Sequence, residues 1–220
     1  PALRHAMQTD TECAVRAAAA QALFSLGQLA DVDRFALAAA ESGLPDRVVW
    51  ALRLREERGR GPGIDWVLKT AVFDPAVTVR VQAAVMLGRL GVGAAAPQLH
   101  DMLLSLDPEV KVAAAYGLCQ MHIWKHFDAL KAGTHHPSPA VRRASICFIE
   151  SLRPGRYPAI YDRLMSDPDP DVRLAATVGA RRLAACDSLP LMARRMGDDD
   201  ARVRFAAAAM IRRKLAQAGE

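Results

Sequence analysis

The chain is built from one pattern of apolar and polar positions that recurs along its length. Each copy has a polar turn containing aspartate or proline, then a valine usually followed by arginine, then an alanine-rich apolar run. Clear examples are DPAVTVRVQAAVMLGRLG from Asp74, DPDPDVRLAATVGARRLA from Asp167 and DDDARVRFAAAAMIRRKL from Asp198. The valines at this position are Val15, Val48, Val79, Val112, Val141, Val172 and Val203, at intervals of 29 to 33 residues. A near-constant period of this length predicts a helical-repeat architecture.

Each period has room for two helices. Shorter amphipathic runs such as APQLHDMLLSL, KHFDALKAG and LPLMARRM lie between the valine-containing runs, and glycine and proline mark the joints. In the Asp-Pro turns, aspartate is expected to cap free backbone N–H groups, and proline is tolerated in a first helical turn. Gly88, Gly91 and Gly93 are interpreted as helix ends. One helix pair cannot bury its apolar faces alone, so the pairs are expected to stack around a continuous core.

The predicted fold is therefore all-α: an α-solenoid of about seven helix pairs forming one domain over residues 1–220. The chain is 51% hydrophobic but only 5% aromatic, and alanine, the best helix former, supplies much of the apolar content. Few segments show the alternation that is typical of strands. The repeats are expected near residues 1–30, 31–60, 61–92, 93–123, 124–153, 154–185 and 186–220.

This pattern resembles the HEAT-like repeat family, in particular its short form of about thirty residues, which occurs in phycobilin lyases and many bacterial proteins. The resemblance covers nearly the whole chain and implies that the second helix of each pair lines a concave face. It also implies a ladder in which the arginine after each valine pairs with an aspartate of a neighbouring repeat. The ladder would involve Arg16, Arg80, Arg142, Arg173 and Arg204, with Asp74, Asp107 and Asp167 among the partners. Val49 and Ala113 stand in place of arginine, so the ladder is expected to be broken there.

The net charge of +5 is concentrated at the C-terminal end of the chain. Residues 173–220 hold ten basic and five acidic side chains, which leaves 19 of each for the first 172 residues. A solvated basic face is the simpler interpretation, and contact with an acidic partner is the alternative. An extended nucleic-acid track is not expected along a neutral stretch, and nucleic-acid binding by the basic C-terminal repeats stays as a less favoured alternative.

Four of the six histidines lie in one stretch of the chain: His122, His126, His135 and His136. On one helix, His122 and His126 would share a face and suit a zinc ion. The repeat register instead places them on opposite sides of a turn, and it places His136 where other repeats carry a capping aspartate. No metal or other cofactor is expected, and a metal site assembled across this helix pair is the alternative.

The four cysteines are Cys13, Cys119, Cys147 and Cys186, and they form no CxxC pair from which a zinc motif could be inferred. Cys119 and Cys147 lie in apolar helical runs, where a buried reduced thiol is the usual case. No apolar run reaches the ~20 residues that are needed to cross a bilayer, and no signal peptide is visible. We therefore expect a cytoplasmic protein with no membrane segment in this chain.

No catalytic residue is predicted. The sequence shows no nucleophile–base pair, no phosphate-binding glycine loop and no metal triad. Deoxyhypusine hydroxylases resemble this architecture and hold two irons with repeated His-Glu pairs, but this chain contains no His-Glu dipeptide. Phycobilin lyases also resemble it, and nothing in these residues identifies a chromophore site. A lyase-type enzyme, or an accessory subunit of an enzyme, is the alternative to a non-catalytic protein.

A partner-binding surface is expected two residues, and nine or ten residues, after each valine. If the valine faces the core, then the residues two and nine positions further on point roughly the opposite way, at about 100° per residue. An apolar stripe flanked by a basic stripe would receive an acidic amphipathic helix or peptide. The predicted binding residues are Trp50, Val81, Leu174 and Phe205, with Arg58, Arg89, Arg182, Arg212 and Arg213. The alternative is that the apolar residues pack against the next repeat and the arginines are simply solvated.

The expected function is that of a protein–protein interaction scaffold or adaptor. A preformed concave surface with arginine and aromatic anchors would hold the partner. The rigid stack would keep the ordering cost of binding low.

Overall fold

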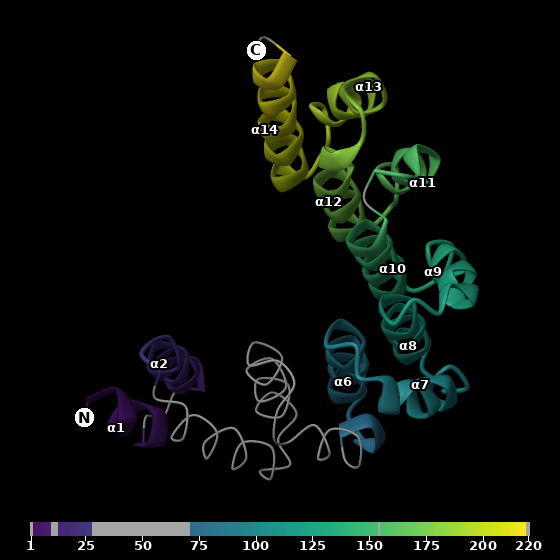
Figure 1. The fold of residues 1–220 in the computed structure, drawn as a ribbon. Coiled ribbons are helices and arrows are strands. Elements are labelled where there is room, and N and C mark those ends of the chain that lie inside the picture. Colours follow the sequence, from purple (N-terminus) through teal and green to yellow (C-terminus); the bar gives the residue numbers. More distant parts are fainter. Residues whose placement is uncertain (1, 10–12, 28–70, 154, 219–220) are drawn as a thin grey trace. The chain divides into compact units, whose positions relative to one another are not determined.

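A computed structural model describes residues 2–9, 13–27, 71–153 and 155–218. Every regular element in these segments is a helix, as the repeat pattern predicts (Figure 1). The α-helices are α1 (Ala2–Thr9), α2 (Cys13–Ser25), α6 (Val77–Arg89), α7 (Ala96–Met102), α8 (Pro108–Gln120), α9 (Phe127–Gly133), α10 (Pro139–Leu152), α11 (Pro158–Leu164), α12 (Pro170–Gly179), α13 (Ala185–Arg195) and α14 (Ala201–Ala218). Short 3-10 turns join them: η1 (Ala71–Phe73), η2 (Gly93–Ala95), η3 (Trp124–His126) and η4 (Ala180–Arg182). Among the helices described, none combines the length and the apolar character that a bilayer-spanning segment requires.

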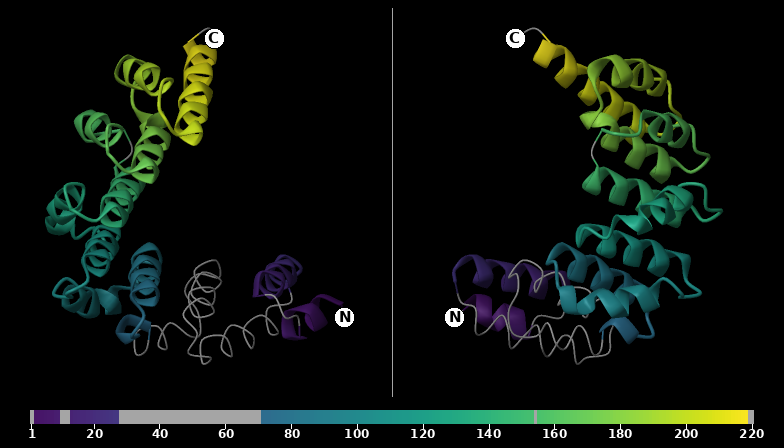
Figure 2. Two further views of the ribbon diagram at one scale, coloured as in Figure 1. Left: turned by 180° about the vertical axis from the view of Figure 1, so that it is seen from behind. Right: turned by 45° about the vertical axis from the view of Figure 1, so that its right-hand side comes forward.

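The helix contacts group the chain into two compact units, Pro1–Met121 and His122–Glu220. The division falls close to the junction expected between the fourth and fifth repeats. In the described part of the first unit, α1 packs on α2, while α6 and α7 both pack on α8. In the second unit, α10, α12 and α14 lie side by side in one layer, and α9, α11 and α13 form the other layer (Figures 1 and 2). This stacking of consecutive helix pairs is the predicted α-solenoid architecture.

The valine that defines each repeat lies on the second helix of its pair. Val79, Val112, Val141, Val172 and Val203 lie on α6, α8, α10, α12 and α14, and each is at most 5% exposed. Val15 on α2 differs, with 39% of its surface exposed, and Val48 lies outside the described residues. The assumption that the valine faces the core is therefore confirmed for five repeats.

The core of the second unit lies between its two layers. Ile146, Val172, Ala176 and Ala207 from the layer of second helices meet Tyr161, Leu164, Leu191 and Met192 from the layer of first helices. Because most of these side chains are aliphatic and alanine is frequent, the layers can approach closely and bury a continuous apolar strip. Each helix pair therefore completes its core only together with its neighbours.

Aspartates in the turns before the second helices have two roles. Asp169 is the N-cap of α12, and its carboxylate accepts hydrogen bonds from the N–H groups of Asp171 and Val172, at 2.9 and 3.1 Å. Asp107 is the N-cap of α8 but makes no cap hydrogen bond, contrary to the expectation for an Asp-Pro turn. Its carboxylate instead accepts from Arg80 of the preceding repeat. The capping role predicted from the sequence therefore holds only in some turns.

Gly88 does not mark a helix end, contrary to expectation. It lies within α6 against Gly117 of α8, and a Cβ added to Gly88 would lie 2.3 Å from the Cα of Gly117. The two helices can approach this closely because neither residue has a side chain at the crossing. Gly91 does follow the end of α6, with a φ of 59° that L-residues rarely adopt. Gly93 lies in η2, and no atom lies within 4 Å of a Cβ added there.

Candidate functional site

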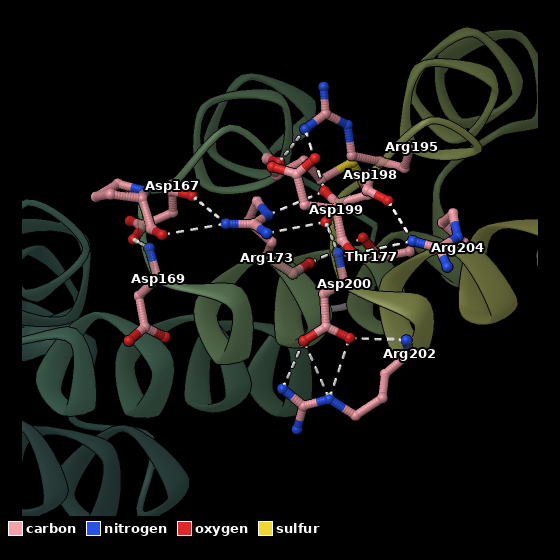
Figure 3. Close-up of polar contacts among 12 residues, drawn as sticks. Asp167, Asp169, Arg173, Thr177, Arg195, Asp198, Asp199, Asp200, Arg202 and Arg204 are labelled. Atoms are coloured by element: carbon pink, nitrogen blue, oxygen red, sulfur yellow. Dashed lines mark hydrogen bonds and ion pairs between the residues drawn. The ribbon is translucent and has the colours of Figure 1, made fainter.

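Arg173 connects its own turn to the next repeat (Figure 3). Its Nη1 donates to the backbone oxygens of Asp167 and Pro168, at 3.0 and 3.1 Å, in the turn before its own helix. Its Nε and Nη2 donate to the two carboxylate oxygens of Asp198, at 2.9 and 2.8 Å, in the turn of the following repeat. One side chain therefore fixes the entry to α12 and holds the entry to α14.

The same arrangement recurs at two other repeats. Arg142 donates from Nε and Nη2 to Asp167, at 2.8 and 2.6 Å. Arg80 donates from Nη2 to Asp107. The Asp167 and Asp198 side chains are 5% and 3% exposed, whereas that of Asp107 is 41% exposed. The predicted ladder is confirmed at these positions, and its arginines hold the repeats together. The side chain of Arg16 and all of Val49 lie outside the described residues.

The ladder arginines favour the ionised form of two of their aspartates, Asp167 and Asp198. The hydrogen bond from Arg173 is the main reason that the pKa of Asp198 lies below its ordinary value. For Asp167, burial raises the pKa, but the hydrogen bonds from Arg142 and from the Asp169 N–H outweigh burial, and the pKa is lowered. The half-buried Asp200 lies against Arg202, which lowers its pKa to about 2.

His136 takes over part of the role of the missing ladder aspartate. Its Nδ1 accepts a hydrogen bond from the N–H of Ser138 at 3.1 Å, as the Asp167 carboxylate accepts from the N–H of Asp169 at 3.0 Å. Its backbone oxygen accepts from Arg142 Nη1 at 2.9 Å. His136 therefore stands where other repeats carry aspartate, as predicted, but it closes the turn and does not cap α10, whose N-cap is Ser138.

The other three histidines of the stretch lie at separate positions before and after α9. His122 is exposed and has a φ of 64°, directly after the end of α8, where glycine follows α6. His126 is half-buried in η3, and His135 is exposed. Within the described segments, no group of three or more His, Cys, Asp or Glu side chains is placed to hold a metal ion.

Cys119 is buried, as expected, but Cys147 is exposed, which corrects the sequence interpretation. Cys147 lies six residues after the core-facing Val141 and therefore about 120° away around α10. An apolar run in a helix does not by itself bury each of its members.

A second set of hydrogen bonds between repeats was not predicted. Arg163 on α11 donates to the backbone oxygen and the hydroxyl of Thr134, at 2.9 and 2.6 Å. Arg195 on α13 donates to the backbone oxygen of Met165 at 2.6 Å. Each arginine thereby satisfies a carbonyl near the end of the preceding first helix. The only sequence signal is a basic residue near the end of these short helices, which is too common to be specific.

A polar pocket of about 300 Å³ lies beside the Arg173–Asp198 pair. It is lined by Ser166, Arg173, Arg194, Arg195, Gly197, Asp198 and Asp199. Each of the three arginines already has an acceptor, because Arg194 pairs with Asp162 at 2.9 Å and Arg195 binds a backbone oxygen. The pocket is therefore better explained by repeat packing than by the binding of an anionic ligand.

The predicted apolar binding residues differ in exposure. Val81 and Leu174 are half-buried, whereas Phe205 on α14 is 77% exposed. Ala114, at the equivalent position of α8, is fully buried. The alternative interpretation, packing against the next repeat, therefore applies fully to Ala114 and partly to Val81 and Leu174. Trp50 lies outside the described residues.

The predicted basic residues also differ. Arg89 donates from Nε to the hydroxyl of Tyr116 at 3.2 Å, and Arg182 lies 3.5 Å from the carboxylate of Glu150 with half of its side chain exposed. Arg212 and Arg213 are exposed on α14. Arg58 lies outside the described residues. The structure thus groups Leu174, Arg182, Phe205, Arg212 and Arg213 on α12, η4 and α14 of the second unit.

Glu150 and Tyr161 form a buried polar contact that sequence reasoning missed. The Tyr161 hydroxyl donates to Glu150, and Tyr161 is fully buried. The pKa of Tyr161 is raised above its ordinary value, mainly by burial and secondly by this hydrogen bond. Glu150 lies nine residues after Val141, on the side predicted to face away from the core. The sequence holds no signal that places a first-helix tyrosine against it.

An aromatic cluster lies at the start of the second unit. The Arg153 guanidinium lies 4.3 Å from the ring centre of Trp124, which is 36% exposed. Phe127 lies 5.5 Å from Tyr157 between ring centres. Because Trp124 already has a cation over its face, the cluster is explained by intramolecular cation–π stacking.

No protein-family model and no curated protein sequence matches this chain. The fold is similar to the crystal structure of YibA from Escherichia coli, with a TM-score of 0.57, 17% sequence identity, and coverage of 80% of this chain and 68% of YibA. Human deoxyhypusine hydroxylase in complex with glycerol matches with a TM-score of 0.41 and 14% identity, over 87% of this chain and 98% of that one, a likeness too low to carry an argument. Together with the stacked helix pairs, the likeness to YibA indicates a HEAT-like helical-repeat fold.

Proposed function

We propose that this chain is a non-catalytic scaffold or adaptor that binds another protein through the second helices of its last repeats. The observation that carries the proposal is Phe205, which is 77% exposed on a helix that also exposes Arg212 and Arg213. Aromatic and arginine side chains are the residue types most enriched among binding anchors. Neither arginine forms an ion pair with the described residues.

The partner we propose is an acidic amphipathic segment. Leu174 and Arg182 would extend the surface from α14 onto α12, and the preformed stack would lower the ordering cost of binding. In the first unit, Val81 and Arg89 are further candidate contacts, and Trp50 and Arg58 stay predictions. The repeat interval supports assignment to the short form of HEAT-like repeat. Within the described residues, Cys119, Cys147 and Cys186 form no disulfide, which supports a reducing compartment such as the cytoplasm.

The test is affinity capture from host lysate with the intact chain, at low and high salt and with and without nuclease, followed by mass spectrometry. We expect a discrete protein that survives nuclease and salt. The double variant Phe205→Asp/Arg213→Glu should lose it while keeping its helical content and melting temperature, because both side chains are exposed.

The matched control is Leu106→Asp/Arg156→Glu, which makes the same charge change at exposed positions elsewhere, Leu106 being 96% exposed. It should retain the partner. Recovery of nucleic acid alone, with steep loss as salt rises, would replace the proposal with nucleic-acid binding by the basic C-terminal repeats. A chromophore or metal that co-purifies with the chain would favour the lyase-type alternative.

A further inference from the structure

The ladder arginine of α14 has the local geometry of the others without their acidic acceptor. Arg204 Nη1 donates to the backbone oxygens of Asp198 and Asp199, at 2.7 and 2.9 Å. Arg173 makes the same two bonds to its own turn and then uses Nε and Nη2 for the carboxylate of Asp198. Among the described residues, no carboxylate accepts from the Nε or Nη2 of Arg204 (Figure 3). Its guanidinium is therefore already oriented, with two donor groups unused.

The apolar residue next to this arginine is also uncovered. Leu174, which follows Arg173, is half-buried, whereas Phe205, which follows Arg204, is 77% exposed. Leu215 on the same helix is 58% exposed. The face of α14 defined by Arg204, Phe205 and Leu215 thus offers an oriented fork of donors beside apolar surface. A carboxylate matches such a fork in both geometry and charge.

We infer that this α14 face binds a helix of a separate protein, with an aspartate in the turn before that helix bound to Arg204 and small apolar side chains packed on Phe205. The inference rests on the proposed function and names the chemistry of its partner. The precedent lies within the chain, since α12 packs on α10 with Asp167 bound to Arg142, and α14 packs on α12 with Asp198 bound to Arg173. The partner helix would pack on α14 in the way that α14 packs on α12.

Charge favours an acidic helix over a second α14. Two copies of α14 packed face to face would bring Arg204, Arg212 and Arg213 of one copy towards the same residues of the other, which is repulsive. The aspartate turns of Asp107, Asp167 and Asp198 are already bound to ladder arginines of their own chain. A separate chain with an aspartate turn meets neither obstacle.

The experiment supplies such a helix at high effective concentration. Residues 167–180, DPDPDVRLAATVGA, are appended after Glu220 through a flexible Gly/Ser linker. From Arg204 to the end of α14 is roughly 21 Å at 1.5 Å per residue. A linker of about 16 residues has a root-mean-square span of roughly 22 Å, which gives an effective concentration of about millimolar. Hydrogen exchange of the amides of α14 is then measured by mass spectrometry, against a chain that carries the same segment scrambled.

We expect the native appended segment to slow exchange in α14 about ten-fold relative to the scrambled one. Replacing the appended aspartate that corresponds to Asp167 by asparagine should remove most of this protection without altering the host chain. Phe205→Ser should do the same, because that side chain is exposed and its loss leaves the fold intact. Equal exchange with native and scrambled segments would overturn the inference.

The other binding partners are distinguishable outcomes. Protection of α14 in the plain chain that grows with protein concentration would assign the face to a second copy. Protection on adding a DNA oligonucleotide, lost as salt rises, would assign it to nucleic acid. If lysate capture depends on Phe205 and Arg213 while the appended helix gives no protection, then the proposed function stands and only this docking mode is wrong. If the appended helix protects α14 but no protein is captured from lysate, then the docking mode stands and the proposed function is wrong.

Discussion

Both carboxylate oxygens of Asp198 accept hydrogen bonds from the guanidinium of Arg173, which lies 25 residues earlier in the chain. The two side chains are 3% and 14% exposed. The pair fixes the approach of α14 to α12 and the entry into both helices, so it couples local structure to the stacking of repeats. Two other pairs of this kind recur in the described chain, but they differ in burial. The differences predict how much free energy of unfolding is lost when the aspartate of each pair is replaced.

Asp198→Ala should lower the free energy of unfolding by about 3 kcal/mol, because it leaves a largely buried guanidinium without its acceptor. Asp107→Ala is the matched comparison, since Asp107 accepts one bond and is 41% exposed. It should cost about 1 kcal/mol or less. Urea denaturation followed by circular dichroism measures both. Equal losses at the two positions would contradict the argument from burial.

Gly88→Ala should destabilise the chain by about 3 kcal/mol, because the new methyl group would overlap the backbone of α8 at Gly117 and force the helices apart. Gly93→Ala makes the same chemical change where an added Cβ meets no atom within 4 Å. It should shift the free energy of unfolding by about 0.5 kcal/mol or less. Thermal and urea denaturation of the two variants provide the measurement. A mild effect at Gly88 would mean that the helices separate at little cost.

His122→Gly should stabilise the chain by about 0.5–1 kcal/mol. His122 has a φ of 64°, a conformation that costs an L-residue about 1–2 kcal/mol and glycine little. The reciprocal control is Gly91→Ala at the equivalent position after α6, which should lose about 1 kcal/mol. His122→Ala should bring no gain, because alanine keeps the same steric conflict. Stabilisation by alanine as well as glycine would assign the effect to the imidazole rather than to the backbone.

Acid should weaken the ladder in a defined pH window. The pKa values of Asp167 and Asp198 are lower in the folded chain than the ordinary carboxyl value of 3.8. Their contribution is therefore complete above the ordinary value and is lost as the pH falls through the lowered values. The free energy of unfolding, measured by urea denaturation at pH 7, 4 and 3, should fall between the last two.

Asp198→Asn should start less stable at pH 7 and show a shallower decline below pH 4, because one of the carboxyl groups that titrate is gone. Asp187→Asn, an exposed aspartate in the first turn of α13, is the control and should decline as the unmodified chain does. An unchanged slope in Asp198→Asn would mean that this carboxyl group does not link proton binding to folding.

The repeat period and the helix pairs follow from the sequence, and the pairing of ladder arginines with aspartates follows from the resemblance to HEAT-like repeats. The valine at a fixed offset specifies which helix face is buried, because that face depends on helical geometry and on contacts between successive repeats. The placement of His136 in a turn where other repeats carry aspartate was predictable for the same reason. These features are set by positions within one period or between adjacent periods.

Other features depend on how the helices pack in three dimensions. The crossing of α6 and α8 at Gly88 and Gly117, and the contact of Tyr161 with Glu150, depend on where two helix surfaces meet, which periodicity does not specify. Exposure of Phe205 is decided in the same way, since Ala114 at the equivalent position of α8 is buried while Val81 and Leu174 are half-buried. The sequence determined which residues form the repeat, and tertiary packing decided which equivalent positions remain open, because burial depends on the neighbouring element as well as on the residue itself.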